Sequence, residues 1–410
     1  MTDNVQVVVV GGGYAGVLAA NRLRQRTDID VTLVNHRAAF VERIRLHQLV
    51  AGTNDAVEDY ATLLADGVRL VVDSAERIDA AAHRVRLASG DTLIYDYLVY
   101  AVGSTGSVPA GVPGAAEFAY PLSELEPARR LADRLADVPE SAPMVIVGGG
   151  LTGIEAAAEF AEAGRPVSLA TDVLGPSLGA GGRRSVAKRL AKLGVTVIEG
   201  AVVARVAADR VTLVDGRELP SAVTVWTAGF AVPKLAAASG LTTDPLGRLL
   251  TDETLTSLDT PSIVAAGDAA CPSGLPLRMS CQAALPMGAQ AANTILARVA
   301  ERAPAALNQA FTGQCISLGR HAATVQLAHL DDAPLPLHLG GRFAASVKEA
   351  VCKGTVSFLT REARKPGSYF WLKGGKRAQR VTESLTESVT ESLTEPVTEP
   401  VTESVPESLT

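Results

Sequence analysis

One stretch of twenty residues occurs twice in this chain in nearly the same form, and it limits the possible folds more than any other feature. The first copy, VVVVGGGYAGVLAANRLRQR, covers residues 7–26, and the second, VIVGGGLTGIEAAAEFAEAG, covers residues 145–164. In each copy an apolar, β-branched run precedes a G-x-G-x-x-G motif, and helix-forming residues follow it. This order predicts a strand buried on both faces, a tight turn and a helix.

The three glycines of each copy have separate tasks in such a turn. The first allows the tight turn, the second lets the backbone approach a pyrophosphate, and the third lets the helix pack close to the strand. The unpaired N–H groups and positive dipole end of the helix suit phosphate groups. The residues expected to bind the two dinucleotides are Gly11, Gly13, Tyr14, Ala15 and Gly16 in the first copy and Gly148, Gly150, Leu151, Thr152 and Gly153 in the second. Two such turns predict two dinucleotides and electron transfer between them.

The composition fits a well-buried α/β protein of two or three domains. The chain has 410 residues, too many for one core, and 47% of them are hydrophobic. No run reaches the ~18 apolar residues of a membrane span, and the first strand begins too early to leave room for a signal peptide. The four cysteines come late and far apart, which favours free thiols in a reducing cytoplasm. Nothing indicates nucleic-acid binding, and no Cys, His or carboxylate cluster has metal-binding spacing.

Four motifs together resemble the FAD-dependent pyridine nucleotide–disulfide oxidoreductases, and among them most of all the type II NADH dehydrogenase-like branch. The motifs are the two glycine turns, the strand end Ala101 to Gly103, and IVAAGDAA with Gly267 and Asp268. The resemblance covers residues 5–300. It implies FAD at the first turn, NADH or NADPH as the substrate at the second, and a hydrogen bond between Asp268 and the ribityl chain of FAD.

The resemblance also implies an α/β fold with two Rossmann-like dinucleotide-binding domains, in which the NAD(P) domain interrupts the FAD domain. The expected FAD halves are 1–115 and 240–310, and the expected NAD(P)H domain is 116–239. A C-terminal α+β segment, 311–380, follows. The last thirty residues, 381–410, repeat V/L-T-E-S/P and carry seven Glu without Lys or Arg, so we expect a disordered acidic tail.

The chain departs from the family where an acidic residue usually binds ribose hydroxyls. Asn35 stands at the end of the second strand, where its amide can still bond a hydroxyl, although without charge assistance. Thr171 stands at the matching place of the second unit, followed by Asp172. NADH and NADPH therefore both stay open. Gly229, after the last strand of the second unit, is a further expected nucleotide-binding residue.

The electron acceptor has to take electrons directly from the flavin. Disulfide-reducing members of the family carry a cysteine pair in the FAD domain or the NAD domain, and this chain has no cysteine before Cys271. Type II NADH dehydrogenases carry A-Q-x-A near the quinone, and this chain has CQAA at residues 281–284. Gln282 is the matching residue, so the resemblance implies a catalytic role for it. The resemblance thus implies a small-molecule acceptor of the quinone type. The alternatives are a reductase of a small redox protein such as a ferredoxin, and an NADH-sensing flavoprotein similar to apoptosis-inducing factor.

Three further features allow two interpretations each. Glu155 lies two residues after the last glycine of the second turn; it either faces the nicotinamide as a catalytic residue or is an acid at a helix N-terminus. The segment FVERIRLHQ, residues 40–48, either faces the flavin or is a surface helix. Residues 341–380 combine ten Lys or Arg with two Glu and five aromatic residues. They predict either contact with the inner face of the plasma membrane or a covering segment that could form a homodimer.

Overall fold

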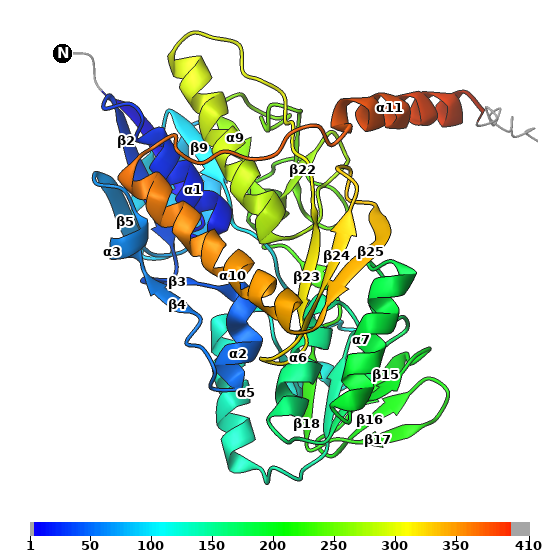
Figure 1. Cartoon of the computed structure of the whole chain (residues 1–410). Helices are drawn as coiled ribbons and strands as arrows, with labels where there is room; N and C mark the ends of the chain where they lie inside the picture. Colours follow the sequence, from blue (N-terminus) through cyan, green and yellow to red (C-terminus); the bar gives the residue numbers. More distant parts are fainter. Residues whose placement is uncertain (1–3, 395–410) are drawn as a thin grey trace, which may run out of the picture.

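Two five-stranded parallel sheets, one built on each glycine turn, organise the molecule (Figure 1). The structure is a computed structural model, which describes residues 4–394. The strands of the first sheet, in spatial order, are β21 (Ile263–Ala265), β9 (Tyr97–Tyr100), β1 (Val5–Val10), β2 (Ile29–Asn35) and β5 (Val68–Val72). Those of the second sheet are β11 (Ala119–Pro121), β18 (Val223–Trp226), β12 (Met144–Val147), β13 (Val167–Ala170) and β14 (Thr196–Ile198).

The two sheets follow one plan. In both, the strand before the glycine turn is central and the next strand along the chain lies beside it. Each unit also has a small antiparallel sheet, which consists of β6 (Ala75–Asp79), β7 (Arg84–Leu87) and β8 (Thr92–Ile94) in the first, and of β15 (Val203–Val206), β16 (Arg210–Leu213) and β17 (Glu218–Pro220) in the second. The units differ in their fifth strand. In the first sheet it is β21, which comes after the whole second unit in the chain. The predicted fold class, with one dinucleotide unit interrupting the other, is therefore confirmed.

Helices cover the first sheet closely. The helix of the first turn, α1 (Tyr14–Leu23), is buried from Ala15 to Leu23, because α9 (Cys281–Val299) and α10 (Gly341–Arg364) lie against it (Figure 1). The approach of α9 is so close that a Cβ on Gly288 would lie 2.2 Å from the carbonyl oxygen of Ala15. In the second unit the helix of the turn is α6 (Leu151–Glu162), accompanied by α5 (Leu125–Asp137) and α7 (Ala180–Lys192).

Short elements connect these units. The helices are α2 (Leu46–Val50), α3 (Tyr60–Leu63), α4 (Ala115–Phe118), α8 (Leu235–Ala238) and the 3-10 turns η1 (Arg43–Arg45) and η2 (Gly267–Ala269). The strands are β3 (Ala39–Val41), β4 (Val57–Asp59), β10 (Thr105–Gly106), β19 (Phe230–Ala231), β20 (Leu249–Thr251) and β22 (Ala270–Pro272).

The C-terminal segment is an antiparallel sheet followed by a long helix. Its strands are β23 (Gly313–Ser317), β24 (Ala323–Ala328) and β25 (Pro334–Gly340), and α10 runs from them back across α1 (Figure 1). This agrees with the predicted α+β segment. The helix α10 therefore reaches both dinucleotide units. Among residues 4–394 no helix is both long enough and apolar enough to cross a bilayer.

The prediction of a disordered tail is wrong for residues 381–394. They belong to α11 (Arg377–Thr394), which extends away from the body of the molecule (Figure 1). The repeat places valine or leucine at every fourth residue, and positions four apart lie on the same side of a helix, so the spacing is compatible with a helical turn. Residues 395–410, the other part of the predicted tail, lie outside the described residues.

Candidate active site at the two glycine turns

The first and third glycines of each turn leave no room for a side chain. Gly11 and Gly148 have φ values of +105° and +113°, which favour glycine. A Cβ on Gly11 would lie 2.3 Å from the carbonyl oxygen of Ala101, and one on Gly148 would lie 2.8 Å from the nitrogen of Ala228. At the third position a Cβ would lie 1.8 Å from the carbonyl oxygen of the first glycine in the first turn and 1.9 Å in the second. Both turns are therefore tight, as the sequence predicts.

The middle glycine of each turn faces open space instead. A Cβ on Gly13 or Gly150 would meet no atom within 4 Å. These residues are also the N-caps of α1 and α6, and neither helix has a side-chain cap. An open space in front of uncapped helix N–H groups fits the pyrophosphate of a dinucleotide. The residues present thus fit FAD at the first turn and a nicotinamide dinucleotide at the second, while the contacts assigned to Tyr14, Ala15, Leu151 and Thr152 stay predictions.

A carboxylate stands beside the first turn. Gly267 lies against α1, because a Cβ on it would be 3.2 Å from the Cβ of Ala15. Asp268 follows at once, and its Oδ2 accepts a hydrogen bond of 2.6 Å from the Ser104 hydroxyl, directly after Gly103. Arg43 donates from Nη1 to the carbonyl oxygen of Ser104 at 2.8 Å. The structure therefore brings the strand end 101–104 and the 267–268 motif together at the first turn, as the resemblance implied, and fixes the carboxylate that would face the ribityl chain.

The two predicted ribose-binding residues hold the turns themselves. The Asn35 Oδ1 accepts from the N–H of Gly12 at 3.0 Å, and its Nδ2 donates to the carbonyl of Arg37 at 2.9 Å. The Thr171 hydroxyl accepts from the N–H of Gly149 at 2.9 Å and donates to the carbonyl of Val173 at 3.0 Å. Each side chain thus takes the same structural role in its own copy. Whether either also contacts a ribose stays a prediction.

The end of β18 forms the matching side of the second turn. Thr227 donates its hydroxyl to the carbonyl oxygen of Val147 at 2.8 Å, and Gly229 follows with φ +82° on the surface. This side offers no carboxylate comparable to Asp268 among residues 227–229. The nucleotide-binding role of Gly229 stays a prediction.

Glu155 is neither a solvent-exposed helix acid nor an isolated one. Its Oε1 accepts from the Nζ of Lys348 at 2.8 Å and from the backbone N–H of Ser317 at 2.9 Å, and its Oε2 lies 4.0 Å from the Nδ1 of His47. Burial favours the neutral acid, but the charge of Lys348 outweighs it and lowers the pKa of Glu155. Burial opposes the charge on Lys348 as well, and Glu155 raises its pKa above the ordinary value. The two groups form a buried ion pair.

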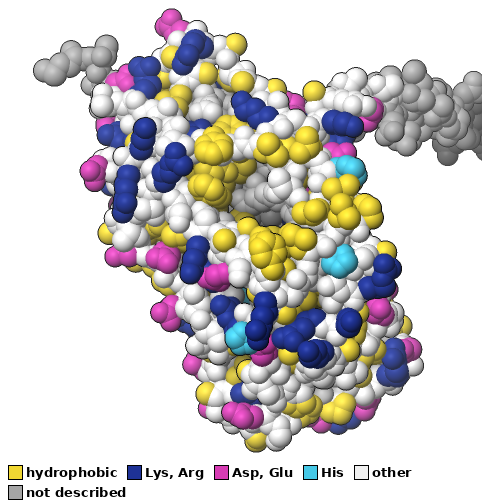
Figure 2. Space-filling view, viewed as in Figure 1, with side chains coloured by type: hydrophobic (Ala, Val, Ile, Leu, Met, Phe, Trp, Pro, Cys, Tyr) yellow, Lys and Arg dark blue, Asp and Glu magenta, His cyan; other side chains and the backbone are white. Residues whose placement is uncertain are grey.

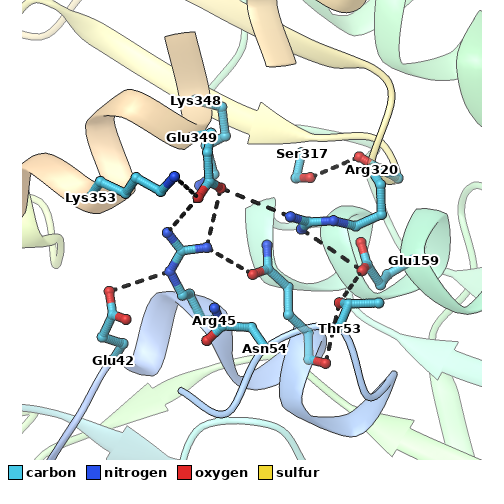
Figure 3. A network of polar contacts seen from close by, with 12 residues as sticks. Glu42, Arg45, Thr53, Asn54, Glu159, Ser317, Arg320, Lys348, Glu349 and Lys353 are labelled. Carbon is cyan, nitrogen blue, oxygen red and sulfur yellow. Dashed lines mark hydrogen bonds and ion pairs between the residues drawn. The ribbon is translucent and has the colours of Figure 1, made fainter. Parts of the chain in front are cut away.

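The surface-helix interpretation of residues 40–48 is wrong. Glu42, Arg45 and His47 are all buried, because α2 packs against α5 and α6. Arg45 binds Glu42 at 3.3 Å and Glu349 of α10 at 3.1 Å (Figure 3). Figure 3 shows how charged side chains from η1 and its N-cap, from α6 and from α10 converge with Arg320 of the turn between β23 and β24. This polar network joins both dinucleotide units to the C-terminal segment.

Gln282 lies at the first turn of α9, and its side chain is used inside the protein. In the amide orientation that satisfies both ends, its oxygen accepts from the N–H of Thr312 at 3.1 Å and its nitrogen donates to the carbonyl of Gly313 at 3.0 Å. Pro286 removes the helical hydrogen bond to the Gln282 carbonyl, which accepts from Nε2 of Gln309 at 2.9 Å instead. Gln282 therefore ties α9 to β23, and its predicted catalytic role stays a prediction.

Two residues of the candidate site escaped the sequence analysis: Ser104 and Lys348. Ser104 follows directly after a recognised motif, so its position was the available signal. Lys348 was counted among the basic residues of 341–380 and only the fold places it beside Glu155. No local pattern distinguishes it from the other nine basic residues of that segment.

The duplicated fold and the two turns are those of an oxidoreductase that binds two dinucleotides. Comparison with known proteins identifies its family. Residues 5–310 match the family model described as pyridine nucleotide-disulphide oxidoreductase. An NADH dehydrogenase-like protein of Mycobacterium tuberculosis is 32% identical over 323 residues, which are 71% of this chain and 80% of that protein. A type II NADH:quinone oxidoreductase of the same organism is 28% identical over 346 residues, 73% and 74% of the two chains.

The solved structure of a sulfide:quinone oxidoreductase from Aquifex aeolicus has the same fold, with a TM-score of 0.74, 20% identity and 96% coverage of each chain. The chain belongs to the pyridine nucleotide-disulphide oxidoreductase family and resembles its type II NADH dehydrogenase members. It is an FAD-dependent enzyme that oxidises a pyridine nucleotide.

Proposed function

We propose that this protein oxidises NADH or NADPH and passes the electrons to a quinone. When bound at the first turn, FAD would supply the two-electron chemistry that links the pyridine nucleotide to the acceptor. The chain binds the two dinucleotides, orients them and excludes water. The observation that carries the proposal is the buried ion pair of Glu155 and Lys348, which lies where the second turn, the C-terminal segment and α2 meet.

The ion pair suits an acceptor that needs protons as well as electrons. Lys348 keeps its proton in this surrounding, since Glu155 raises its pKa, and a protonated amine can donate a hydrogen bond to a carbonyl oxygen of a quinone. The relatives named type II NADH:quinone oxidoreductase support the same acceptor. The cysteines are free, and burial raises the pKa of Cys281 to about 11, which favours an unreactive thiol. An unreactive thiol does not take electrons from the flavin, which supports transfer directly to a quinone.

An acceptor panel with the purified holoprotein tests this proposal. NADH and NADPH are each offered with a short-chain benzoquinone, an oxidised redox dye and an oxidised small iron–sulfur protein. Fast turnover with the quinone is the expected result. Turnover only with the iron–sulfur protein would support the ferredoxin-reductase alternative. A slow reaction with every acceptor and a long-lived reduced complex would support the NADH-sensing alternative.

We further propose that the C-terminal segment contacts an anionic membrane, in which quinone dissolves. Figure 2 shows apolar side chains gathered around a hollow on the face that carries α10 and β23–β25. The exposed apolar residues of this segment are Leu330, Leu337, Leu339, Phe343, Val351, Phe358, Phe370 and Leu372. A group of this kind is uncommon on a protein that stays in water. Lys353, Arg361 and Arg364 of α10 are exposed as well, and each basic residue near an anionic surface contributes ~1 kcal/mol.

The aromatic residues divide between the two interpretations of the segment. Phe370 is exposed, but Tyr369 stacks on Trp371 with ring centroids 6.2 Å apart, and the Trp371 nitrogen donates to the carbonyl of Asn308.

Co-sedimentation with anionic liposomes tests the contact, using the full chain and a chain that ends at Arg380. Binding that weakens as salt rises, and that strengthens when the seven Glu of the tail are removed, is expected. If neither form pellets at low salt, the segment is a cover or a dimer interface, and size-exclusion chromatography then distinguishes these two.

A further inference from the structure

One side of α6 carries a row of acidic residues from the protein surface to the buried ion pair. Glu155, Glu159 and Glu162 are spaced by four and three residues, so they lie on the same side of the helix. Their side chains differ in exposure: that of Glu162 is 22% exposed, whereas those of Glu159 and Glu155 are 2% and 9% exposed. The row therefore begins at the solvent and ends at the Nζ of Lys348.

Two buried polar atoms beside this row have no hydrogen-bond partner. They are Oε2 of Glu159 and Nε2 of His47. The other oxygen of Glu159 accepts from the hydroxyl of Thr53 at 2.7 Å, and the other nitrogen of His47 lies 4.0 Å from Glu155. A buried polar atom without a partner destabilises the fold, so two of them next to an ion pair require an explanation.

The reaction proposed above needs a path for one proton. NADH gives up a hydride, which carries two electrons and one proton, and a quinone needs two electrons and two protons to become a quinol. One proton per turnover must therefore come from water. We propose that Glu159 and His47 carry this proton from the surface at Glu162 to the ion pair of Glu155 and Lys348. This inference rests on the proposed acceptor.

Both groups are in a suitable protonation state for this role. Burial raises the pKa of Glu159, and the charges of Glu162 and Glu155 raise it further, although Thr53 and Arg320 lower it. A carboxyl group with a raised pKa takes up and releases a proton closer to neutral pH.

Burial lowers the pKa of His47 to about 4, so its ring is neutral in neutral solution. Glu155 acts against this shift, while Lys348, Arg320 and Arg45 act with it. A neutral imidazole has one N–H and one free nitrogen. It therefore accepts a proton at one nitrogen and releases the other proton from the second, with no net change in charge.

The residues that contact the row are also polar and charged. Arg320, in the turn between β23 and β24, lies 3.9 Å from Glu159 and 3.9 Å from Glu349 of α10 (Figure 3). Figure 3 shows Thr53 and Arg320 both pointing toward Glu159. These contacts hold the row beside α2, the helix that carries His47.

The test compares an acceptor that needs protons with one that does not. Ferricyanide takes one electron at a time and no proton, whereas a short-chain benzoquinone takes both. The variants are Glu159→Gln and His47→Gln, which keep the size and polarity of the side chain. The matched controls are Glu140→Gln, in the exposed turn after α5, and His83→Gln, in the hairpin of β6 and β7. All are purified with their flavin and assayed with NADH.

We expect quinone turnover to fall about a hundredfold in both path variants, which is the low end for loss of a proton-transfer group. Ferricyanide turnover should stay within about twofold, because it requires no proton transfer. In the variants, quinone turnover should also decrease as pH rises, since water then supplies fewer protons, and the wild type and both controls should be flatter.

Three outcomes would overturn the inference or its basis. If both acceptors slow down together, Glu159 and His47 only support the structure. If quinone turnover is unchanged in both variants, the proton takes another route. If one variant loses its flavin, the other variant tests the inference by its quinone turnover relative to its ferricyanide turnover. A wild type that reduces ferricyanide and no quinone contradicts the proposed acceptor itself, and this result is visible before any variant is made.

Discussion

The two glycine turns are nearly identical in backbone, yet their helices present opposite chemistry to α10. Where α6 has Glu155 and Glu159, the equivalent positions of α1, seven and eleven residues after the first glycine of each turn, hold Leu18 and Arg22. Arg22 donates to Glu362 of α10 at 2.7 Å, while Glu155 accepts from Lys348 of the same helix at 2.8 Å. The helix α10 therefore binds both copies. It supplies the acidic partner to α1 and the basic partner to α6.

The copies also differ in what surrounds the open space at the middle glycine. The first turn has Asp268, which is held by Ser104, and its helix is covered by α9 as well as α10. The second turn has only the hydroxyl of Thr227 on the matching side, and this hydroxyl is used by backbone carbonyls. We therefore expect the first site to hold its dinucleotide through many turnovers. We expect the second site to release its dinucleotide after each hydride transfer.

The largest expected difference comes from a valine at the middle glycine of each turn. Gly13→Val places a side chain in the open space of the first turn, so the purified protein should be largely colourless. Gly150→Val should keep its yellow flavin and lose reduction by NADH, while dithionite still reduces it. Absorbance spectra and NADH titration measure both. A third variant, Gly16→Val, should not fold, because its Cβ would lie 1.8 Å from a backbone oxygen. Full flavin content in Gly13→Val would end the assignment of the first turn.

The carboxylate at the first turn should have the next largest effect. Asp268→Ala removes a charged hydrogen bond, which costs about 1.5–3 kcal/mol, or roughly ten- to a hundredfold in FAD affinity. Ser104→Ala should weaken FAD less, because the carboxylate stays. The control is Thr227→Val at the second turn, which should leave FAD binding unchanged. Fluorescence titration of the apoprotein gives the three dissociation constants, and equal loss in all three variants would contradict a specific role of Asp268.

The sequence predicts the backbone of both sites well, because a glycine turn is a local feature. The glycines at positions 11, 13 and 16 and their partners in the second copy specify a strand, a turn and a helix without help from the remaining chain. The interrupted order of the units also follows from motifs, since IVAAGDAA comes after the second turn. The first part of the tail, residues 381–394, is less predictable. A repeat with valine or leucine at every fourth position lacks a core-forming face, but it does not exclude the helix α11.

The charged residues of the site are where the sequence is insufficient. Glu155 stands out by its place after a motif, but its partner Lys348 is almost two hundred residues away, and only tertiary packing brings them together. The same holds for His47, whose helix looks amphipathic enough for the surface until α5 and α6 cover it. Ion pairs of this kind depend on the relative placement of three units, which no local spacing encodes.

The titratable groups beside the second turn predict a dependence of stability on pH. The pKa of His47 is about 4 in the folded protein and ~6.5 when unfolded, so the unfolded chain binds more protons between these values. The contribution of His47 is complete above pH 6.5 and is lost as pH falls toward 4. Between pH 7 and pH 5 the wild type should lose about 2 kcal/mol more than His47→Gln. Denaturant unfolding at the two pH values measures this, with His83→Gln as the control.

The residue that follows the second strand of each unit should produce a smaller difference between the two sites. Asp172 is exposed after β13, where the adenosine ribose of the second dinucleotide is expected, and His36 is the equivalent residue of the first unit. A carboxylate repels the extra phosphate of NADPH, so Asp172→Ser should improve kcat/KM for NADPH relative to NADH by about fivefold, the effect of ~1 kcal/mol between charges in water. His36→Ser should change neither ratio nor FAD content. An unchanged ratio in Asp172→Ser would place the ribose elsewhere.

The smallest expected effect is that of the tail on catalysis. The helix α11 extends away from the body of the molecule (Figure 1). Its start is held separately, because Arg377 binds both carboxylate oxygens of Glu253 at 2.7 and 2.8 Å and donates to the carbonyls of Pro272 and Leu275. A chain that ends at Arg380 keeps this anchor, so its flavin content, melting temperature and NADH–ferricyanide turnover should equal those of the full chain. Arg377→Ala in the full chain should lower the melting temperature instead, because removing one partner of a buried ion pair leaves the other uncompensated. If truncation after Arg380 slows NADH oxidation, the tail acts on the second turn, and the separation between a closed FAD site and an open nucleotide site has to be revised.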